Sequence, residues 1–302
     1  MLTVALAFSL CLIAPASAMA EGADLAPGTI EGLTPGAGEA QHDWGEWEVV
    51  KAATLTAEGF EVRQCKGCGA VETRITPALG PVKTDLELCV GAAEAAGFTD
   101  LDPKAWYMTM PDGNFPETLT LYLDYVVSKG YMSGYEGVGL FAPQDTVTRA
   151  MTATVIYRMA NGVAVSAQAS DQATDVETGF ADVSAGQWYS TAVAWCAEQG
   201  ITVGYEGEGR FGPDDPVTRE QLATMIFRYC TKVKGQQPRQ TSLSRFSDQA
   251  QISPWAADGV AHCAVYGIVS GYTDGTGRFG PQDTGTRAQL AKIVAVTAYM
   301  LE

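Results

Sequence analysis

The fold is decided by the stretch Val203-Gly-Tyr-Glu-Gly-Glu-Gly-Arg-Phe-Gly-Pro-Asp-Asp-Pro-Val-Thr-Arg-Glu-Gln-Leu222. It reads as a glycine-rich loop, an aromatic residue, a Pro-Asp turn and the start of a helix. The same pattern occurs twice more, as Ser133-Gly-Tyr-Glu-Gly-Val-Gly-Leu-Phe-Ala-Pro-Gln-Asp-Thr-Val-Thr-Arg-Ala150 and as Ser270-Gly-Tyr-Thr-Asp-Gly-Thr-Gly-Arg-Phe-Gly-Pro-Gln-Asp-Thr-Gly-Thr-Arg-Ala288. Three copies of one loop-to-helix joint predict a repeat array, with the function at that joint.

Each copy of the joint lies between two expected helices. Helical spacing of apolar residues predicts the first helix of each pair near residues 119–128, 192–199 and 256–266, and the second over 149–160, 219–232 and 287–301. Each unit opens on a Phe-x-Asp motif that is followed by a tryptophan, namely Trp106, Trp188 or Trp255. A further helix is expected over 84–96, an insertion around 108–117, and linkers over 163–179 and 234–245. One helix–loop–helix unit cannot bury both of its helices, so we expect the three units to pack together into a mainly α bundle.

The composition and the N-terminus bear on location and partners. The net charge of −16 in 302 residues argues against nucleic acid and against an anionic membrane surface as partners. Residues 1–20 form an apolar run that contains Ala16-Ser-Ala18, which predicts a cleaved signal peptide, and residues 21–40 read as a linker. We therefore expect an exported protein that has no membrane insertion after cleavage.

Residues 41–80 differ from the rest of the chain. Short alternating runs separated by glycines predict a small antiparallel β module that contains Cys65 and Cys68. These two cysteines supply half of a tetrahedral metal site, with His42 as the nearby third ligand, whereas a disulfide or a pair of free thiols is the favoured interpretation. The module resembles a short Cys-x-x-Cys module of surface proteins from anaerobic Firmicutes, in which another cysteine commonly stands at the position of Leu55. Four further cysteines are expected as buried free thiols, namely Cys89, Cys196, Cys230 and Cys263.

The repeated joint has a threonine cap and an arginine directly after it. Thr148, Thr218 and Thr286 can each accept a hydrogen bond from the first helical turn, and Gln221 and Gln289 can return a bond to the cap. A cation in the first turn of a helix opposes the helix dipole, which leaves two interpretations of the arginines Arg149, Arg219 and Arg287. Either each forms an ion pair with an upstream aspartate (Asp145, Asp215 or Asp283), or free backbone N–H groups and the guanidinium together bind an anion. The two interpretations are compatible.

Tryptophans, Gly-Tyr loops and histidines are further candidates for a site. Trp188 and Trp255 fall at helix starts, where they would either stack on a sugar or pack internally, whereas Trp195 lies within a helix and is expected in the core. The Gly-Tyr loops would either let the backbone approach a ligand or simply make tight turns. His42 and His262 are isolated, with His262 expected to face the core, and no catalytic triad, phosphate loop or metalloprotease motif occurs. The sequence predicts a binding protein without a cofactor rather than an enzyme.

These motifs resemble the S-layer homology (SLH) domain in three consecutive copies over about residues 84–302. The resemblance rests on Phe-x-Asp, the tryptophan, the Gly-Tyr loop, Phe-x-Pro-x-Asp and Thr-Arg. It implies a pseudo-threefold bundle whose inter-repeat grooves bind a secondary cell-wall polysaccharide, often pyruvylated. The glutamate that usually follows Thr-Arg-Ala is replaced by Met151, Gln221 and Gln289, and Gly285 replaces an aliphatic residue. The expected ligand-binding residues are Arg149, Arg219, Arg287, Thr148, Thr218, Thr286, Trp188, Trp255, Asp182, Asp248, Gly204 and Gly271.

We therefore expect non-covalent anchoring of a secreted protein at the cell wall through this polysaccharide, with surface-layer proteins as the further class of partner. The expected SLH repeats span 84–162, 180–235 and 246–302. The alternative is a self-associating component of a surface layer whose arginines are only ion-paired.

Overall fold

The computed structural model describes residues 42–54, 58–77, 89, 91–102, 104–107, 122–162 and 177–301. The chain divides into two units, Met1–Gln41 and His42–Glu302, and every described residue belongs to the second. The signal peptide, the linker at 21–40, the insertion around 108–117 and most of the linker at 163–179 were predicted for residues outside these ranges. None of the helices within the described ranges combines the length and the apolar character needed to cross a membrane.

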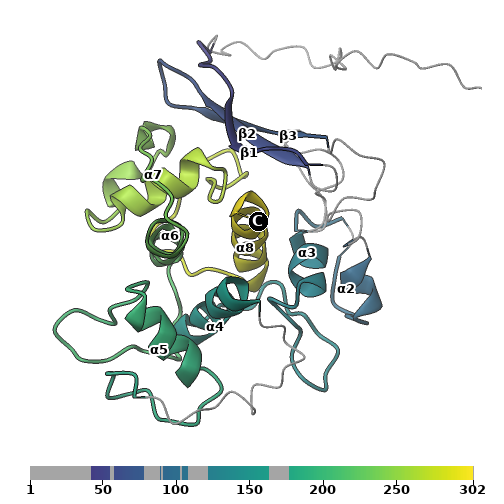
Figure 1. The fold of residues 1–302 in the computed structure, drawn as a ribbon, viewed down its shortest axis with the longest axis vertical. Helices are drawn as coiled ribbons and strands as arrows, with labels where there is room; N and C mark the ends of the chain where they lie inside the picture. Colours follow the sequence, from purple (N-terminus) through teal and green to yellow (C-terminus); the bar gives the residue numbers. More distant parts are fainter. Residues whose placement is uncertain are drawn as a thin grey trace, which may run out of the picture. The chain divides into compact units, whose positions relative to one another are not determined.

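The β module is a three-stranded antiparallel sheet in the order β1 (Glu48–Lys51), β2 (Gly59–Gln64) and β3 (Val71–Thr76). Its alternation places Phe60 and Val62 in the core of the second unit. The sheet lies beside the last helix, where Lys51 Nζ donates a hydrogen bond of 3.1 Å to the backbone carbonyl of Tyr299 (Figure 1). The predicted β module is therefore confirmed, and it packs on the helical part of the chain.

The helices follow the predicted repeats closely. A short helix, α2 (Ala92–Ala95), precedes the helix pairs α3 (Tyr122–Ser128) with α4 (Arg149–Asn161), α5 (Ser190–Glu198) with α6 (Arg219–Arg228), and α7 (Ala257–Val265) with α8 (Arg287–Leu301). The second helix of repeat two was predicted to run to about residue 232, and the helix does continue there, as a π-helical turn over Tyr229–Val233. Within the helix expected at 84–96, Cys89 and Ala92–Ala95 are α-helical among the residues that the structure describes.

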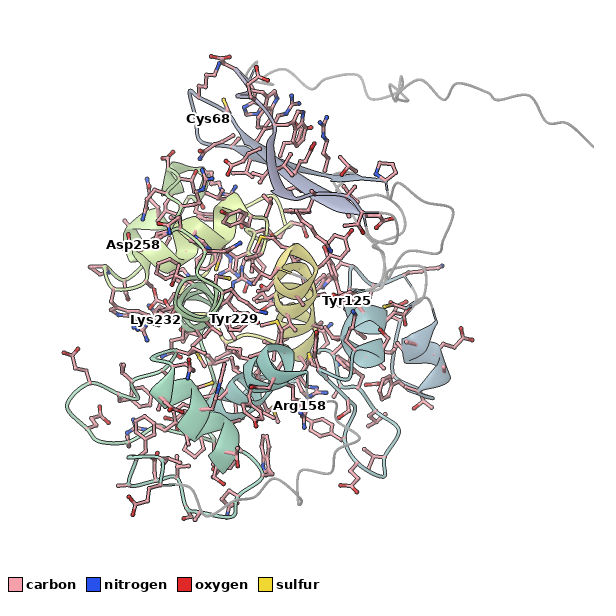
Figure 2. All side chains as sticks on the ribbon, viewed as in Figure 1. Cys68, Tyr125, Arg158, Tyr229, Lys232 and Asp258 are labelled. Carbon is pink, nitrogen blue, oxygen red and sulfur yellow. The ribbon has the colours of Figure 1, made fainter. Side chains whose placement is uncertain are left out.

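The helix pairs that pack together come from different repeats. Helix α4 packs against α5, α6 against α7, and α8 against α3, so the third repeat returns to the first (Figure 1). At this closing contact, the ring of Tyr125, which is labelled in Figure 2, meets that of Tyr299 edge to face with centroids 6.3 Å apart. The predicted mainly α, pseudo-threefold bundle is confirmed, and its closure is cyclic.

Three short extended segments hold the centre of this ring together. The backbone N–H of Val217 donates to the carbonyl of Val147, that of Gly285 to Val217, and that of Val147 to Gly285, over 2.9 to 3.0 Å. A Cβ atom at Gly285 would lie 2.5 Å from Leu222 Cδ1. Glycine at the third position thus leaves room for the side chain of Leu222.

Candidate functional site: three grooves between repeats

The repeated helix starts have the predicted caps. The hydroxyl oxygens of Thr148, Thr218 and Thr286 each accept from a backbone N–H of the first turn, at 3.3 Å. Gln221 and Gln289 return a bond to the backbone of the cap residue, whereas Met151 cannot. Each second helix therefore begins at its arginine.

Each motif arginine contacts the next repeat rather than its own. The Nε atoms of Arg149, Arg219 and Arg287 donate to the carbonyls of Phe211, Phe279 and Phe141, each over 2.7 Å. Arg219 and Arg287 also donate from Nη2 to the carbonyls of Ser270 and Ser133. The arginines therefore join repeat one to two, two to three, and three back to one.

Aromatic rings of the neighbouring repeat pack against each guanidinium. Arg219 lies 4.8 Å from the ring centre of Tyr272 and 5.0 Å from that of Phe279, and the other two arginines have equivalent pairs. Burial lowers the pKa of all three guanidinium groups from its usual value. A desolvated guanidinium between aromatic faces favours a further anionic partner.

The expectation of free backbone N–H groups at the helix starts is wrong. The N–H of Arg219 donates to the carbonyl of Asp283 and that of Glu220 to Pro281, and the other two helices repeat both bonds with their neighbours. The third N–H of each helix is taken by the threonine cap. The neighbouring loop therefore occupies the positions at which an anion would have met the helix dipole.

The upstream aspartates do not form the expected ion pairs either. Asp215 pairs with Arg210 at 2.8 Å and Asp283 with Arg278 at 2.7 Å, while Asp145 accepts from the Tyr135 hydroxyl. Within the described part of the chain, no salt bridge involves a motif arginine. The arginines use carbonyl oxygens where carboxylates were expected, so the ion-pair interpretation is not met.

The aspartates of the Phe-x-Asp openings accept hydrogen bonds from the backbone of the joint in their own repeat. Asp182 accepts from the N–H groups of Phe211 and Gly212, and Asp248 from those of Phe279 and Gly280, over 2.7 to 2.8 Å. The phenylalanine is thus held through its N–H by its own repeat and through its carbonyl by the preceding arginine. Neither aspartate is among the residues that line the grooves described next.

Three equivalent grooves lie between the repeats, and each takes residues from all three copies. We number each groove by the repeat that supplies its Gly-Tyr loop and second helix. The arginine comes from the preceding repeat and the tryptophan from the following one. The first groove has Arg287 and Trp188 and about 410 Å³, the second has Arg149 and Trp255 and about 280 Å³, and the third has Arg219 and Trp106 and about 360 Å³.

Most of the predicted site residues line these grooves. Besides the arginines, Trp188 and Trp255 do so, and their exposures of 45% and 55% leave ring surface open to a ligand. Gly204 and Gly271 line the second and third grooves, and a Cβ at Gly204 would lie 2.4 Å from the carbonyl of Arg210. The hairpin itself therefore requires that glycine. Of the threonine caps, Thr286 lines a groove, whereas Thr148 and Thr218 are not among the lining residues.

Several lining residues were missed at the sequence level. Trp106 occupies the third groove despite the expected insertion after it, so it matches the other two tryptophans. A second cation also lines each groove: Arg158 in the first, Arg228 in the second and Lys292 in the third. These cations lie one or more turns into the second helix, outside the quoted motif, and only their position on the groove side of that helix would have identified them.

His262 is buried, as predicted, and its role is in packing. Its Nδ1 accepts a hydrogen bond of 3.1 Å from the backbone N–H of Arg239, and the rings of Phe227 and Tyr266 lie against it. Burial, with a smaller contribution from the charge of Arg239, lowers its pKa from 6.5 to about 4. The four remaining cysteines of the helical part, Cys89, Cys196, Cys230 and Cys263, are buried free thiols, as expected.

The comparison with protein families agrees with this geometry. The model of the S-layer homology domain matches residues 122–151, 179–223 and 245–291, which contain the first helix, the joint and the start of the second helix of each repeat. The first match covers the joint of repeat one but not Trp106, which the structure nevertheless places in a groove.

The similar proteins are large. An amylopullulanase of Thermoanaerobacterium thermosulfurigenes is 32% identical over 51% of this chain and 8% of its own length. Cell surface glycoprotein 1 of Acetivibrio thermocellus is 30% identical over 55% of this chain and 7% of its own, and the cellulosome-anchoring protein of the same organism is 27% identical over 54% and 34%. The chain thus spans about a third or less of the length of each of these relatives. The family match and the cyclic geometry together identify three consecutive S-layer homology domains in this chain.

Proposed function

We propose that the three SLH domains attach this protein non-covalently to a cell surface by binding an acidic wall polysaccharide in the inter-repeat grooves. The observation that carries the proposal is the repeated pairing, in one groove, of a tryptophan from one repeat with a buried guanidinium from another. An aromatic face suits the apolar side of a sugar, and a guanidinium suits a carboxylate such as that of a pyruvate ketal.

Charge supports an anionic ligand in spite of the acidic composition. The chain has a net charge of −16, yet the described lining residues of each groove include two cations and at most one carboxylate, which is Glu136 in the first and Glu206 in the second. A locally positive groove on an acidic protein attracts an anionic ligand while the remaining surface repels it. The motif arginine presents the remaining edge of its guanidinium, since its Nε is already bonded to a carbonyl.

The names of two relatives are consistent with this role. One is a cell surface glycoprotein and another a cellulosome-anchoring protein, and each matches about half of this chain. We infer surface attachment as the shared part, because a relative named as an enzyme, the amylopullulanase, matches over only 8% of its length. On this view the protein is located outside the cell, at the wall.

The test is co-sedimentation of the full chain with purified cell-wall sacculi, before and after hydrofluoric acid removes the secondary polysaccharide. We expect binding to the intact sacculi and loss of binding after stripping. Equal binding to both samples would contradict the proposal. Sedimentation of the protein without sacculi would instead favour self-association in a surface layer.

The grooves are tested by Trp255→Ala and Trp188→Ala, because both rings are largely exposed and their removal should leave the fold intact. We expect each change to weaken glycan binding by about fivefold, which corresponds to about 1 kcal/mol of stacking. Val138→Ala is the matched control, since Val138 is 58% exposed and does not line a groove. Unchanged affinity in both tryptophan variants would move the binding site elsewhere.

A further inference from the structure

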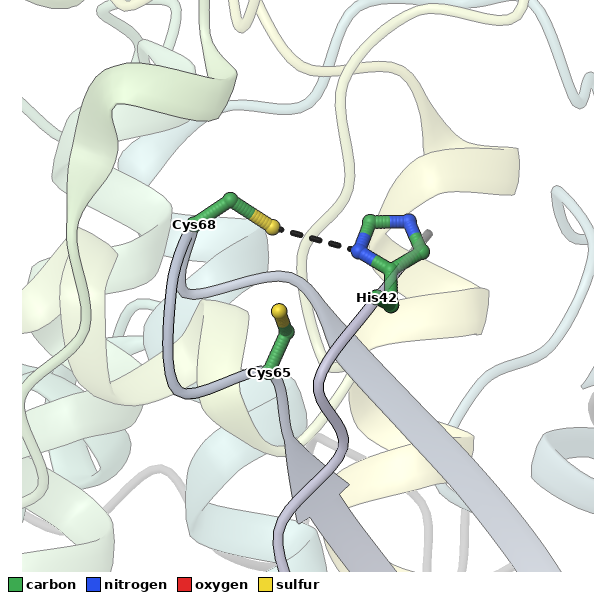
Figure 3. Close-up of side chains that lie close together, drawn as sticks. All are labelled: His42, Cys65 and Cys68. Atoms are coloured by element: carbon green, nitrogen blue, oxygen red, sulfur yellow. Dashed lines mark hydrogen bonds between the residues drawn. The ribbon is translucent and has the colours of Figure 1, made fainter. Parts of the chain in front are cut away.

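The Cys-x-x-Cys turn of the β module brings three metal-ligating side chains together. His42, Cys65 and Cys68 each offer one ligand atom, and these atoms all lie within 4.8 Å of one another (Figure 3). Cys68 Sγ lies 3.3 Å from His42 Nδ1. Tetrahedral zinc with Zn–S of about 2.3 Å and Zn–N of about 2.05 Å requires an S···N separation of about 3.5 Å. The distance from Cys68 Sγ to His42 Nδ1 is already close to this value.

The backbone presents the three groups together. The chain around Trp44 pairs with Cys65 in an antiparallel bridge, and the N–H of Lys66 donates to the carbonyl of Asp43 over 2.8 Å. His42 is thereby brought to the turn from a segment more than twenty positions earlier. The turn closes with Gly69 at φ +72°, a conformation that a side chain would strain.

The turn also brings donors to the Cys65 sulfur. Backbone N–H groups of Cys68 and Gly67 and the side chain of His42 interact with this atom. The thiolate is the form of cysteine that binds metal. Two thiolates and one imidazole form a ligand set suited to zinc.

We propose that His42, Cys65 and Cys68 bind one zinc ion, with the fourth position open to water or an external ligand. The ion would fasten the first segment of the module to the turn between β2 and β3. The turn between β2 and β3 also contacts the segment between repeats two and three, because Thr241 Oγ1 donates to the carbonyl of Gly69 over 3.0 Å. The ion would add to the stability that the sheet gains from packing on the helical part, because the core of the sheet itself is small.

The experiment loads the reduced full chain with zinc or cobalt and measures the bound metal. We expect one zinc per chain by elemental analysis, and cobalt-to-thiolate charge-transfer bands together with the visible bands of tetrahedral cobalt. Cys68→Ser should lower zinc affinity by at least about 100-fold and reduce the charge-transfer intensity, and His42→Gln should shift the visible bands. Cys89→Ala is the matched control, since it removes a buried thiol outside the module and should leave both signals unchanged.

Two outcomes would overturn the proposal. One is a metal content near zero after reduction and loading, which would leave a Cys65–Cys68 disulfide or two thiols as the functional state. The other is cobalt binding whose spectrum is the same in Cys68→Ser and in the unaltered chain, which would place the metal elsewhere. Neither outcome depends on the polysaccharide, so this test is independent of the proposed anchoring function.

Discussion

The second and third grooves are built on the same contacts between repeats, which we call the frame, and differ in the charges of their lining residues. In both, an arginine of the preceding repeat donates to a phenylalanine carbonyl over 2.7 Å and packs against a tyrosine. The second groove adds Arg228 and Glu206, whereas the third has Lys292, one turn closer to the helix start, and no carboxylate among its described lining residues.

The comparison of the grooves distinguishes residues that close the ring from residues that recognise the ligand. The contacts that recur in all three copies close the ring, because each arginine satisfies a carbonyl of the next loop. The lining residues that vary do not close the ring and are free to tune recognition. The third groove, whose described lining has two cations and no acid, should bind an anionic glycan most tightly.

The largest expected effect tests the shared frame. Arg219→Ala removes the donors of the Phe279 and Ser270 carbonyls and the cation between two rings. We expect the free energy of unfolding to fall by about 3 kcal/mol, since each unsatisfied carbonyl costs about 1–3 kcal/mol. Urea unfolding of the full chain measures this loss.

The control for this prediction is Lys234→Ala, which removes a positive charge from an exposed side chain outside the grooves and should leave stability nearly unchanged. If Arg219→Ala weakens glycan binding at unaltered stability, the arginine contacts ligand only, and the separation into frame and lining residues fails. Weaker wall binding in this variant is therefore informative only when it is measured together with folding.

The sequence predicted the frame well where the interaction is local. Thr218 and Gln221 lie within one helical turn, so their spacing alone identified the reciprocal cap that the structure contains. It could not predict the partner of Arg219, because three near-identical repeats contain the same possible acceptors at every copy. Only cyclic closure determines that the acceptor belongs to the next repeat.

Trp106 and Glu220 show the same limit. Trp106 reaches the third groove from a region whose spacing departs from the other copies, so the sequence pattern did not place it there. Glu220 is buried and accepts from Ser253 and Gln282 of repeat three, although its counterparts are alanines. Both depend on contacts between repeats, which local spacing does not encode.

The next effect concerns the core of repeat three, where His262 occupies the position of Trp195 in repeat two. Because the folded-state pKa of His262 is lowered from 6.5 to about 4, the unfolded chain binds the additional proton between these values. Stability should therefore fall as the pH decreases from about 6.5 towards 4, by up to about 3 kcal/mol.

The carboxylates also titrate in this range, so the measurement is the difference between the original chain and His262→Phe in urea unfolding across pH 4–7. We expect the loss of stability on acidification to be smaller in the variant. Parallel pH profiles of stability for the two proteins would show that His262 does not cause the loss of stability at low pH.

A smaller effect tests the groove charges directly. Lys292→Thr gives the third groove the residue that Thr224 and Thr154 supply in the other two, and we expect glycan affinity to fall about fivefold, or about 1 kcal/mol. Thr224→Lys should strengthen binding in the second groove by a similar factor. Isothermal titration with the purified wall polysaccharide measures both, with Lys234→Thr as the charge-matched control. An unchanged affinity for Lys292→Thr would mean that the third groove is not the preferred one.

The smallest effect lies in the first repeat, where Ala142 has φ +54° at the position of Gly212 and Gly280. A left-handed conformation costs a non-glycine residue roughly 1–2 kcal/mol. Glycine avoids this cost, but it increases the entropy of the unfolded chain, which lowers stability by about 0.4–1 kcal/mol. Ala142→Gly should therefore stabilise the chain by about 0.5–1 kcal/mol, measured by urea unfolding.

Gly212→Ala is the reciprocal test and should destabilise by more, because its Cβ would lie 2.3 Å from the Asp215 carboxylate that pairs with Arg210. If Ala142→Gly lowers stability instead, the first repeat has adapted to alanine, and the three frames are less alike than their hydrogen bonds indicate.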